Sequence, residues 1–271
     1  MLKLALFLIG MSFIFFAHGS ANYPDYYRYQ ILVDDPTTST VTYQSFSTIP
    51  RIILGLHQKT LNDQKIAAFV MTDWEKPFFS AWAFEEKDKR FSLNFWGGLA
   101  RIPGMNDEAL ALVACHELAH LVGGNPRMNI PQFKSMSSEG QSDFYASAIC
   151  MKNYLRFKHR EKKLTIPQEI TSTGYTLCRT SFDEEEDFLI CLHTQKAIMA
   201  FMELLQHQSS TPLHLDLVTP DPSQVKMTLH DSYPSPQCRI DTLLMGSLCS
   251  TKDYPCNHTN NARPGCWFSE I

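Results

Sequence analysis

The sequence predicts an α+β fold in which a small sheet comes first and a helical part follows. Residues 78–98 contain two aromatic-rich runs joined by a charged turn, which is the pattern of a β-hairpin. The apolar run at 65–71 predicts one more strand before that hairpin. After the hairpin, helical stretches with capping residues at their starts follow one another, and this order of elements favours α+β.

The segments before the sheet are less regular. Residues 23–48 are rich in Tyr, Ser, Thr and Pro, so we expect an extended, irregular lead-in there. Residues 49–64 predict a short helix between this lead-in and the first strand.

The helix after the hairpin has clear signals at both ends. Asn106 or Asp107 can cap its start. It stops at the Gly-Gly-Asn-Pro run at 123–126, because glycine permits a left-handed turn and proline cannot continue a helix. A second helix is expected to follow Ser137 or Ser138 as its N-cap.

Two more helices are expected in the C-terminal half. One spans 182–207 and begins with a cluster of acidic residues, whose charge suits a helix start. That cluster could bind calcium instead, but a solvated helix start is the better interpretation. The last helix has Pro236 in its first turn, a position that proline favours.

The first 21 residues have the pattern of a secretory signal peptide. One lysine precedes an apolar run from residue 4 to 17, and small residues follow, so cleavage is expected after Gly19 or Ala21. A retained membrane anchor is the alternative, because the run is near the lower limit for a span. No later segment reads as long and apolar enough to cross a membrane. We therefore expect a single domain at 22–271, exported to the periplasm or secreted.

Composition restricts the partners. The chain has 271 residues, a hydrophobic content of 44% and a formal net charge of −4. No basic block occurs, so nucleic-acid binding is not expected.

Eight cysteines suit an oxidising compartment and predict disulfides. Four of them crowd the tail at 236–271, which we interpret as loop-rich and disulfide-clipped: Cys238, Cys249, Cys256 and Cys266. A structural zinc site in the tail is disfavoured because no CxxC pair exists. Cys115 and Cys150 lie on two predicted helices and are either bridged or buried core residues.

The stretch at 114–124, Ala-Cys-His-Glu-Leu-Ala-His-Leu-Val-Gly-Gly, contains the motif that indicates chemistry. His116 and His120 are four apart, so on a helix both point the same way and can reach one zinc ion. Glu117 is then held beside the metal, where it can take a proton from water and deliver it to a leaving amine. HExxH is a short pattern that also arises by chance on ordinary helices. Its apolar flanks here favour a buried, functional helix.

A catalytic zinc needs a third protein ligand and an open position. Glu139 follows His120 by nineteen residues at the start of the next helix, and Asp143 lies one turn beyond it. Glu139 can ligate the metal, and Asp143 can accept the outer N–H of a ligand histidine. Two surface acids at a helix start are the alternative, which the spacing after HExxH makes weaker.

HExxH on one helix with ExxxD opening the next resembles the gluzincin metallopeptidases, and most closely the family of the CAAX prenyl endopeptidase and its bacterial chaperone-protease relatives. The resemblance covers roughly 91–156. It implies a zincin-like domain whose active-site helix packs on a small, mostly antiparallel sheet, followed by a helical C-terminal part with disulfides. It also implies that the strand before the helix, here Arg-Phe-Ser-Leu-Asn-Phe-Trp-Gly-Gly-Leu at 90–99, pairs with an extended substrate.

The family also has a late His-Pro element with an arginine five residues after the proline, and its histidine is thought to stabilise the oxyanion. Here Pro234 and Arg239 keep that spacing, but Tyr233 replaces the histidine and His230 lies three residues earlier. Tyr233 and His230 are therefore both candidates for the oxyanion donor. Arg239 is expected to pin the loop or to pair with an acid behind the metal ligands.

The resulting prediction is an exported metalloendopeptidase with one Zn²⁺ per chain and a peptide or protein substrate. Two alternatives stay open. One is a metal-binding, chaperone-like or latent module with little or no turnover, which a tail covering the cleft would favour. The other is a structural protein that has the motif by accident.

Overall fold

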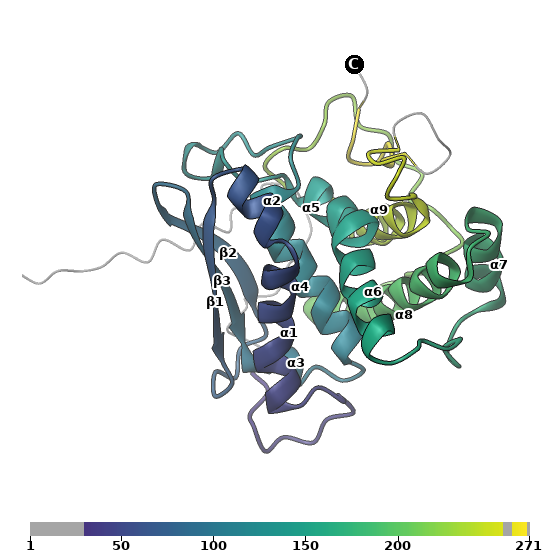
Figure 1. Ribbon diagram of the computed structural model, residues 1–271, viewed down its shortest axis with the longest axis horizontal. Coiled ribbons are helices and arrows are strands. Elements are labelled where there is room, and N and C mark those ends of the chain that lie inside the picture. Colours follow the sequence, from purple (N-terminus) through teal and green to yellow (C-terminus); the bar gives the residue numbers. More distant parts are fainter. Residues whose placement is uncertain (1–29, 257–261, 270–271) are drawn as a thin grey trace, which may run out of the picture.

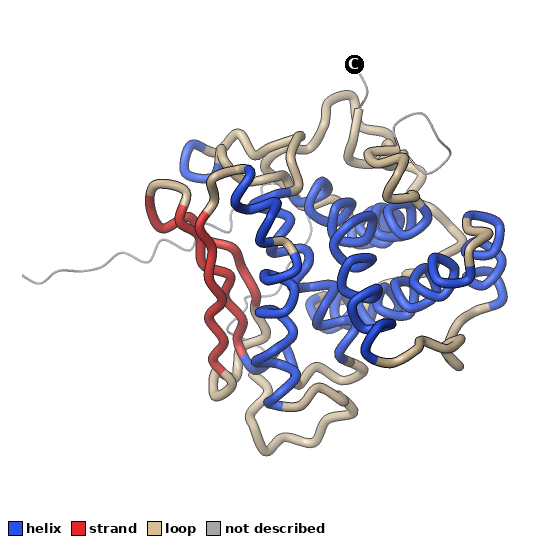
Figure 2. Tube along the Cα trace, in the orientation of Figure 1, coloured by secondary structure: helices blue, strands red, loops and turns tan. Residues whose placement is uncertain are grey.

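The computed structural model describes residues 30–256 and 262–269, so the predicted signal peptide lies outside the described part. Figure 1 shows a small sheet at one side of the molecule and a body of helices packed beside it. Figure 2 separates the two layers by colour, with strands red and helices blue. The predicted α+β class is confirmed.

The chain enters the fold through two helices, α1 (Tyr43–Leu56) and α2 (Gln58–Asp63). Thr42 and Ser45 form a capping box, in which each side chain accepts a hydrogen bond from the other residue's backbone N–H. This cap starts α1 inside the predicted lead-in at 23–48, so that prediction is wrong for its last residues. The one short helix expected before the sheet is in fact two.

The sheet has three strands, β1 (Ala67–Asp73), β2 (Ala81–Lys87) and β3 (Arg90–Trp96), in the order β1-β3-β2. β2 and β3 form the predicted antiparallel hairpin, whereas β1 and β3 are parallel. The sheet is therefore mixed, and the expectation of a mostly antiparallel sheet is wrong. The reason is that β3 returns from the hairpin into the space between β1 and β2, where it runs in the direction of β1.

The central position of β3 overturns a second expectation. Its backbone pairs with β1 on one side and β2 on the other, so it has no free edge for a substrate. Phe91, Leu93 and Phe95 of β3 are each 1% exposed, as expected for a strand in the middle of a sheet. The glycines after β3 start a short helix, α3 (Gly97–Ala100), rather than extending the strand.

The helix α4 (Asp107–Val122) runs through the middle of the molecule. Asn106 caps it as predicted, because its side chain accepts from the N–H groups of Glu108 and Ala109. α4 contacts α1, β2, α5 and α8, and residues 109–122 are all buried. A helix that is buried on every side places any charged residue it bears in a nonaqueous environment.

The helical part contains a column that begins at Glu139 and is interrupted by one π-helical turn, η2 (Ala146–Cys150). The column consists of α5 (Glu139–Tyr145), η2 and α6 (Met151–Glu161). The other helices of this part are α7 (Ser172–Ser181), α8 (Glu185–Gln208) and α9 (Pro236–Leu248). α5, α8 and α9 correspond to predicted helices, with Ser138 in the N-cap position of α5 and Pro236 opening α9. α7, capped by the Thr171 side chain, is a helix that sequence reasoning missed.

α8 differs from the expectation that no later segment resembles a membrane span. Its 24 residues are long and apolar enough by length and composition, with a mean hydropathy of 1.4 in the most apolar window. In the fold 72% of that window is buried inside the protein, and α8 contacts α4, α6, α7 and α9. This placement is that of a core helix.

All eight cysteines form disulfides, which answers the question left open for Cys115 and Cys150. These two residues bridge α4 to the π turn, and the tail is clipped twice, as predicted. The four bridges are Cys115–Cys150, Cys178–Cys191, Cys238–Cys266 and Cys249–Cys256. Because the tail cysteines are paired with one another, they cannot hold a structural zinc.

Candidate metal centre

Two neighbouring helices bring three ligand side chains together. α4 supplies His116 and His120 one turn apart, and α5 supplies Glu139 as its first residue. One ligand atom from each lies within 4.8 Å of the other two, and all three residues are buried. Glu139 Oε2 is 3.1 Å from His116 Nε2 and 3.8 Å from His120 Nε2. Ligands of a tetrahedral zinc with bonds of about 2.0–2.1 Å are separated by about 3.3 Å, a value that lies between these two distances.

The outer nitrogens of both imidazoles are already engaged. Nδ1 of His116 lies 2.7 Å from the Asp143 carboxylate. Nδ1 of His120 lies 2.9 Å from the backbone carbonyl of Ser137 and 3.0 Å from the Ser142 hydroxyl. A carboxylate and a carbonyl only accept, so in each neutral ring the proton is on Nδ1 and the lone pair is on Nε2. Both lone pairs then face Glu139.

This arrangement leaves a buried acceptor without a donor. Glu139 Oε2 accepts no hydrogen bond from a described residue once His116 is neutral, because a lone pair and not a proton faces it. Either an imidazolium proton or a cation can satisfy three converging lone pairs. Two imidazole nitrogens and one carboxylate are also the donor set that Zn²⁺ favours in catalytic sites. The described residues therefore fit a metal ion.

The charges behind the ligands stabilise them. Burial alone would lower the pKa of His116, but the Asp143 and Glu139 carboxylates outweigh it and raise that pKa to about 10. Burial would raise the pKa of Asp143, yet the Arg239 guanidinium and His116 hold it well below its usual range. Arg239 donates to both Asp143 oxygens, at 2.8 and 2.9 Å. A metal ion would replace the positive charge that the His116 proton otherwise supplies.

Glu117 lies on α4 between the two histidines and is 6% exposed. Burial raises the pKa of its carboxyl group, while His116 and His120 and the backbone N–H of Ala83 act in the opposite direction. Ala83 belongs to β2, so the edge strand of the sheet lies beside this carboxylate. A carboxyl group with a raised pKa binds a proton more readily than an exposed one, which suits a group that takes up and releases a proton.

The three candidate residues near the end of the chain lie in two different places. The Arg239 guanidinium lies 5.2 Å from the ring centre of Tyr233, which puts Tyr233 beside the Asp143–Arg239 pair. His230 is anchored to the loop after α4, because its Nδ1 lies 2.6 Å from the Arg127 carbonyl oxygen. The expectation that Arg239 pairs with an acid behind the ligands agrees with its contact to Asp143. The oxyanion role of Tyr233 or His230 stays a prediction.

Sequence reasoning missed the partners of His120. The Ser137 contact uses a backbone carbonyl, which has no residue signature, so the sequence indicates Ser137 only as a helix cap. Ser142 lies within the Glu-Gly-Gln-Ser-Asp stretch, so its position one residue before Asp143 was the available signal.

Comparisons of this chain with models of known protein families, with curated proteins and with solved structures found no match.

Proposed function

We propose that this protein is a zinc-dependent endopeptidase of the gluzincin type, with a zincin-like fold. The observation that supports it most is the convergence of His116, His120 and Glu139 on one point, with Glu117 beside them. Asp143 behind His116 completes the pattern of ligand and orienting carboxylate. When bound, the metal would supply a Lewis acid for the scissile carbonyl and lower the pKa of water.

The side chains divide the remaining work. Asp143 and the Ser137 carbonyl hold the His116 and His120 rings with Nε2 turned inward. Because the pKa of His116 is about 10, its Nε2 proton has to leave when the ion binds at neutral pH. The Glu117 carboxylate takes a proton from water and passes it to the leaving amine. Tyr233 and His230 are the candidate donors to the developing oxyanion.

The substrate strand would add to β2 rather than to β3. Among the described residues β2 pairs only with β3 and forms one edge of the sheet. An extended peptide could continue the sheet there by β-augmentation. The contact between Ala83 and Glu117 would then bring the peptide backbone close to the proton-transfer group.

A latent form is the second candidate, and a specific observation favours it. The four site residues are only 4–7% exposed. The tail lies against α5, because Trp267 packs on Gly140, the neighbour of Glu139. A site this enclosed would require an opening step before a polypeptide reached it.

We also propose that the protein is exported. Four disulfides suit an oxidising compartment, and the first 21 residues read as a signal peptide.

The test combines metal content with turnover in the oxidised full-length mature chain. Zinc per chain is measured by elemental analysis for the wild type, Glu139→Ala and Glu117→Gln, alongside cleavage of unfolded casein. One zinc in the wild type, lost from Glu139→Ala and kept in an inactive Glu117→Gln, supports the peptidase and both roles. Zinc without cleavage by the wild type supports the latent form. Absence of zinc from the folded wild type contradicts both.

A further inference from the structure

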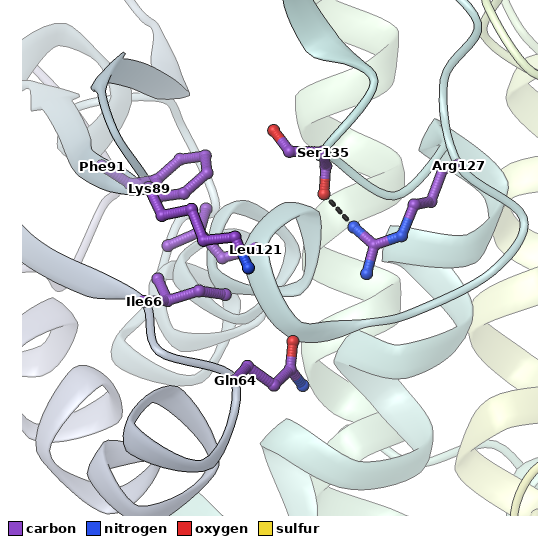
Figure 3. Close-up of a pocket in the computed structure, with 7 residues that line it drawn as sticks. All are labelled: Gln64, Ile66, Lys89, Phe91, Leu121, Arg127 and Ser135. Carbon is purple, nitrogen blue, oxygen red and sulfur yellow. Dashed lines mark hydrogen bonds between the residues drawn. The ribbon is translucent and has the colours of Figure 1, made fainter.

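A cavity lies at the end of α4, the helix that bears His116 and His120. It has a volume of about 360 Å³, within the range of small-ligand sites. Figure 3 shows its lining, which comes from the segment between α2 and β1, the β2–β3 turn, the start of β3, the end of α4 and the loop after α4. The lining residues are Gln64, Ile66, Lys89, Phe91, Leu121, Arg127 and Ser135.

The cavity combines an apolar wall with two cations. Phe91 and Leu121 are each 1% exposed and Ile66 is half-buried, so the apolar side chains are held in place by the core. Lys89 extends into the space from one side and Arg127 lies across from it (Figure 3). An apolar surface next to positive charge complements a ligand that has both an apolar group and an anion.

The two cations are not neutralised by an acid. No carboxylate of a described residue lies within ion-pair distance of Lys89 or Arg127. Arg127 donates to the backbone carbonyl of Ser135, and the acid that reaches this loop, Glu85, accepts from the Ser135 hydroxyl. The lining therefore has two cationic side chains and no acidic one, and the Glu85 carboxylate lies next to it at Ser135.

We propose that this cavity binds the free carboxyl terminus of a polypeptide whose last residue is apolar. Lys89 and Arg127 contact the carboxylate, and Ile66, Phe91 and Leu121 contact the terminal side chain. The Gln64 amide donates to the Val122 carbonyl at 3.5 Å, and its second N–H and its oxygen can bond the terminal peptide group. A fatty acid shares the carboxylate and the apolar chain but offers nothing to that amide.

The cavity and the candidate metal site share the helix α4. Leu121 directly follows the ligand His120 and lies one helical turn beyond Glu117 on α4. Binding itself requires neither metal nor turnover, so it can be tested separately from the proposed peptidase activity.

The experiment measures fluorescence anisotropy of a fluorescein-labelled hexapeptide ending in leucine, with either a free carboxylate or a carboxamide. The protein is the full oxidised chain bearing Glu117→Gln, which prevents cleavage. We expect the carboxamide to bind at least roughly tenfold more weakly, because it loses charge-assisted hydrogen bonds. Lys89→Gln and Arg127→Gln should each weaken binding of the free acid by roughly tenfold.

Lys65→Gln is the matched control. Lys65 and Lys89 both have left-handed backbone conformations, with φ of 58° and 60°, and both are exposed, but Lys65 is not in the cavity lining. Its replacement should leave binding unchanged. Thermal unfolding of each variant checks the fold, and Lys89→Gln keeps the test valid if loss of the Arg127–Ser135 contact destabilises the loop.

Three results would overturn the proposal. The first is equal binding of acid and carboxamide. The second is an equal effect of Lys65→Gln and Lys89→Gln. The third is displacement of the peptide by octanoate at the concentrations at which the peptide itself binds, which would make the cavity a general site for apolar carboxylates.

Discussion

Asp143 and Arg239 form a buried, two-bond ion pair that joins α5 to α9. Nε and Nη2 of the guanidinium donate to the two carboxylate oxygens at 2.8 and 2.9 Å. The same carboxylate lies 2.7 Å from His116 Nδ1. A residue 96 positions away in the sequence thus fixes the orientation of a candidate metal-ligand histidine through one shared acid.

Replacing that acid should affect both stability and metal binding. Asp143→Asn leaves the Arg239 charge buried without a full partner, which costs about 3–5 kcal/mol of unfolding free energy. It also replaces the charged acceptor of His116 Nδ1 by a neutral amide, so we expect metal affinity to fall about 10–100-fold. Urea unfolding and competition with a chelator measure the two effects.

The control is Asp187→Asn. Asp187 pairs with Arg156 at 2.7 Å, but the two side chains are 37% and 29% exposed, so water compensates the loss and we expect at most about 1 kcal/mol. Equal costs for the two variants would show that burial of the Asp143–Arg239 pair has no energetic role.

Gly140→Ala should destabilise the fold. A Cβ at this position would lie 2.3 Å from Trp267, a fully buried aromatic side chain that cannot move aside freely. We expect a loss of about 1–3 kcal/mol from overpacking, measured by urea unfolding. Gly55→Ala is the matched helix control, because nothing lies within 4 Å of its added Cβ, and it should stabilise α1 by about 0.5–1 kcal/mol. A neutral Gly140→Ala would show that the tail is not tightly packed on α5.

Lys152 should make stability depend on pH above neutrality. It is buried, donates to the Cys249 carbonyl and lies 5.0 Å from the Phe182 ring centre. Burial, aided by Arg156, lowers its pKa from 10.5 to about 7. The unfolded chain therefore binds more protons between about pH 7 and 10.5, so this group makes the unfolding free energy rise with pH across that window.

Lys152→Met should reduce that rise, as measured by urea unfolding at pH 7 and 9.5. Lys158→Met is the control on the same helix, since its side chain is 42% exposed, and it should keep the wild-type slope. An unchanged slope in Lys152→Met would place the pH dependence elsewhere.

His193 should make the unfolding free energy fall as the pH rises, which is opposite to the effect of Lys152. Its Nδ1 lies 2.5 Å from a Glu108 oxygen and its Nε2 lies 2.9 Å from the Thr165 carbonyl, so only the imidazolium can donate to both. Burial would lower its pKa, but Glu108 and Thr165 outweigh burial and raise it above 6.5. The stabilisation is therefore fully present below pH 6.5 and is lost as the pH rises through the raised pKa.

We expect His193→Gln to cost about 1–2 kcal/mol more at pH 5.5 than at pH 9, measured by urea unfolding. His214→Gln, at an exposed histidine, should cost little at either pH. A cost that is the same at both pH values would mean that His193 is held by packing and not by its charge.

Local signals in the sequence predicted the parts of the fold that short-range forces determine. The Asn106 cap, the stop at Gly123 and Gly124, and Pro236 at the start of α9 are each set by backbone sterics and hydrogen bonds within a few residues. The four-residue spacing of His116 and His120 belongs to the same class, because helix periodicity alone puts them on one face.

Only the tertiary structure decided which distant groups meet. How helices and strands pack decides the parallel pairing of β1 with β3 and the Ser137 carbonyl on His120. It also decides which acid pairs with Arg239, and it forms the cavity lined by Lys89 and Arg127. Packing is governed by the combined burial of many side chains and leaves no fixed spacing in the sequence. The sequence by itself therefore determined the ligand types and their helices, and packing determined how those ligands are oriented, charged and enclosed.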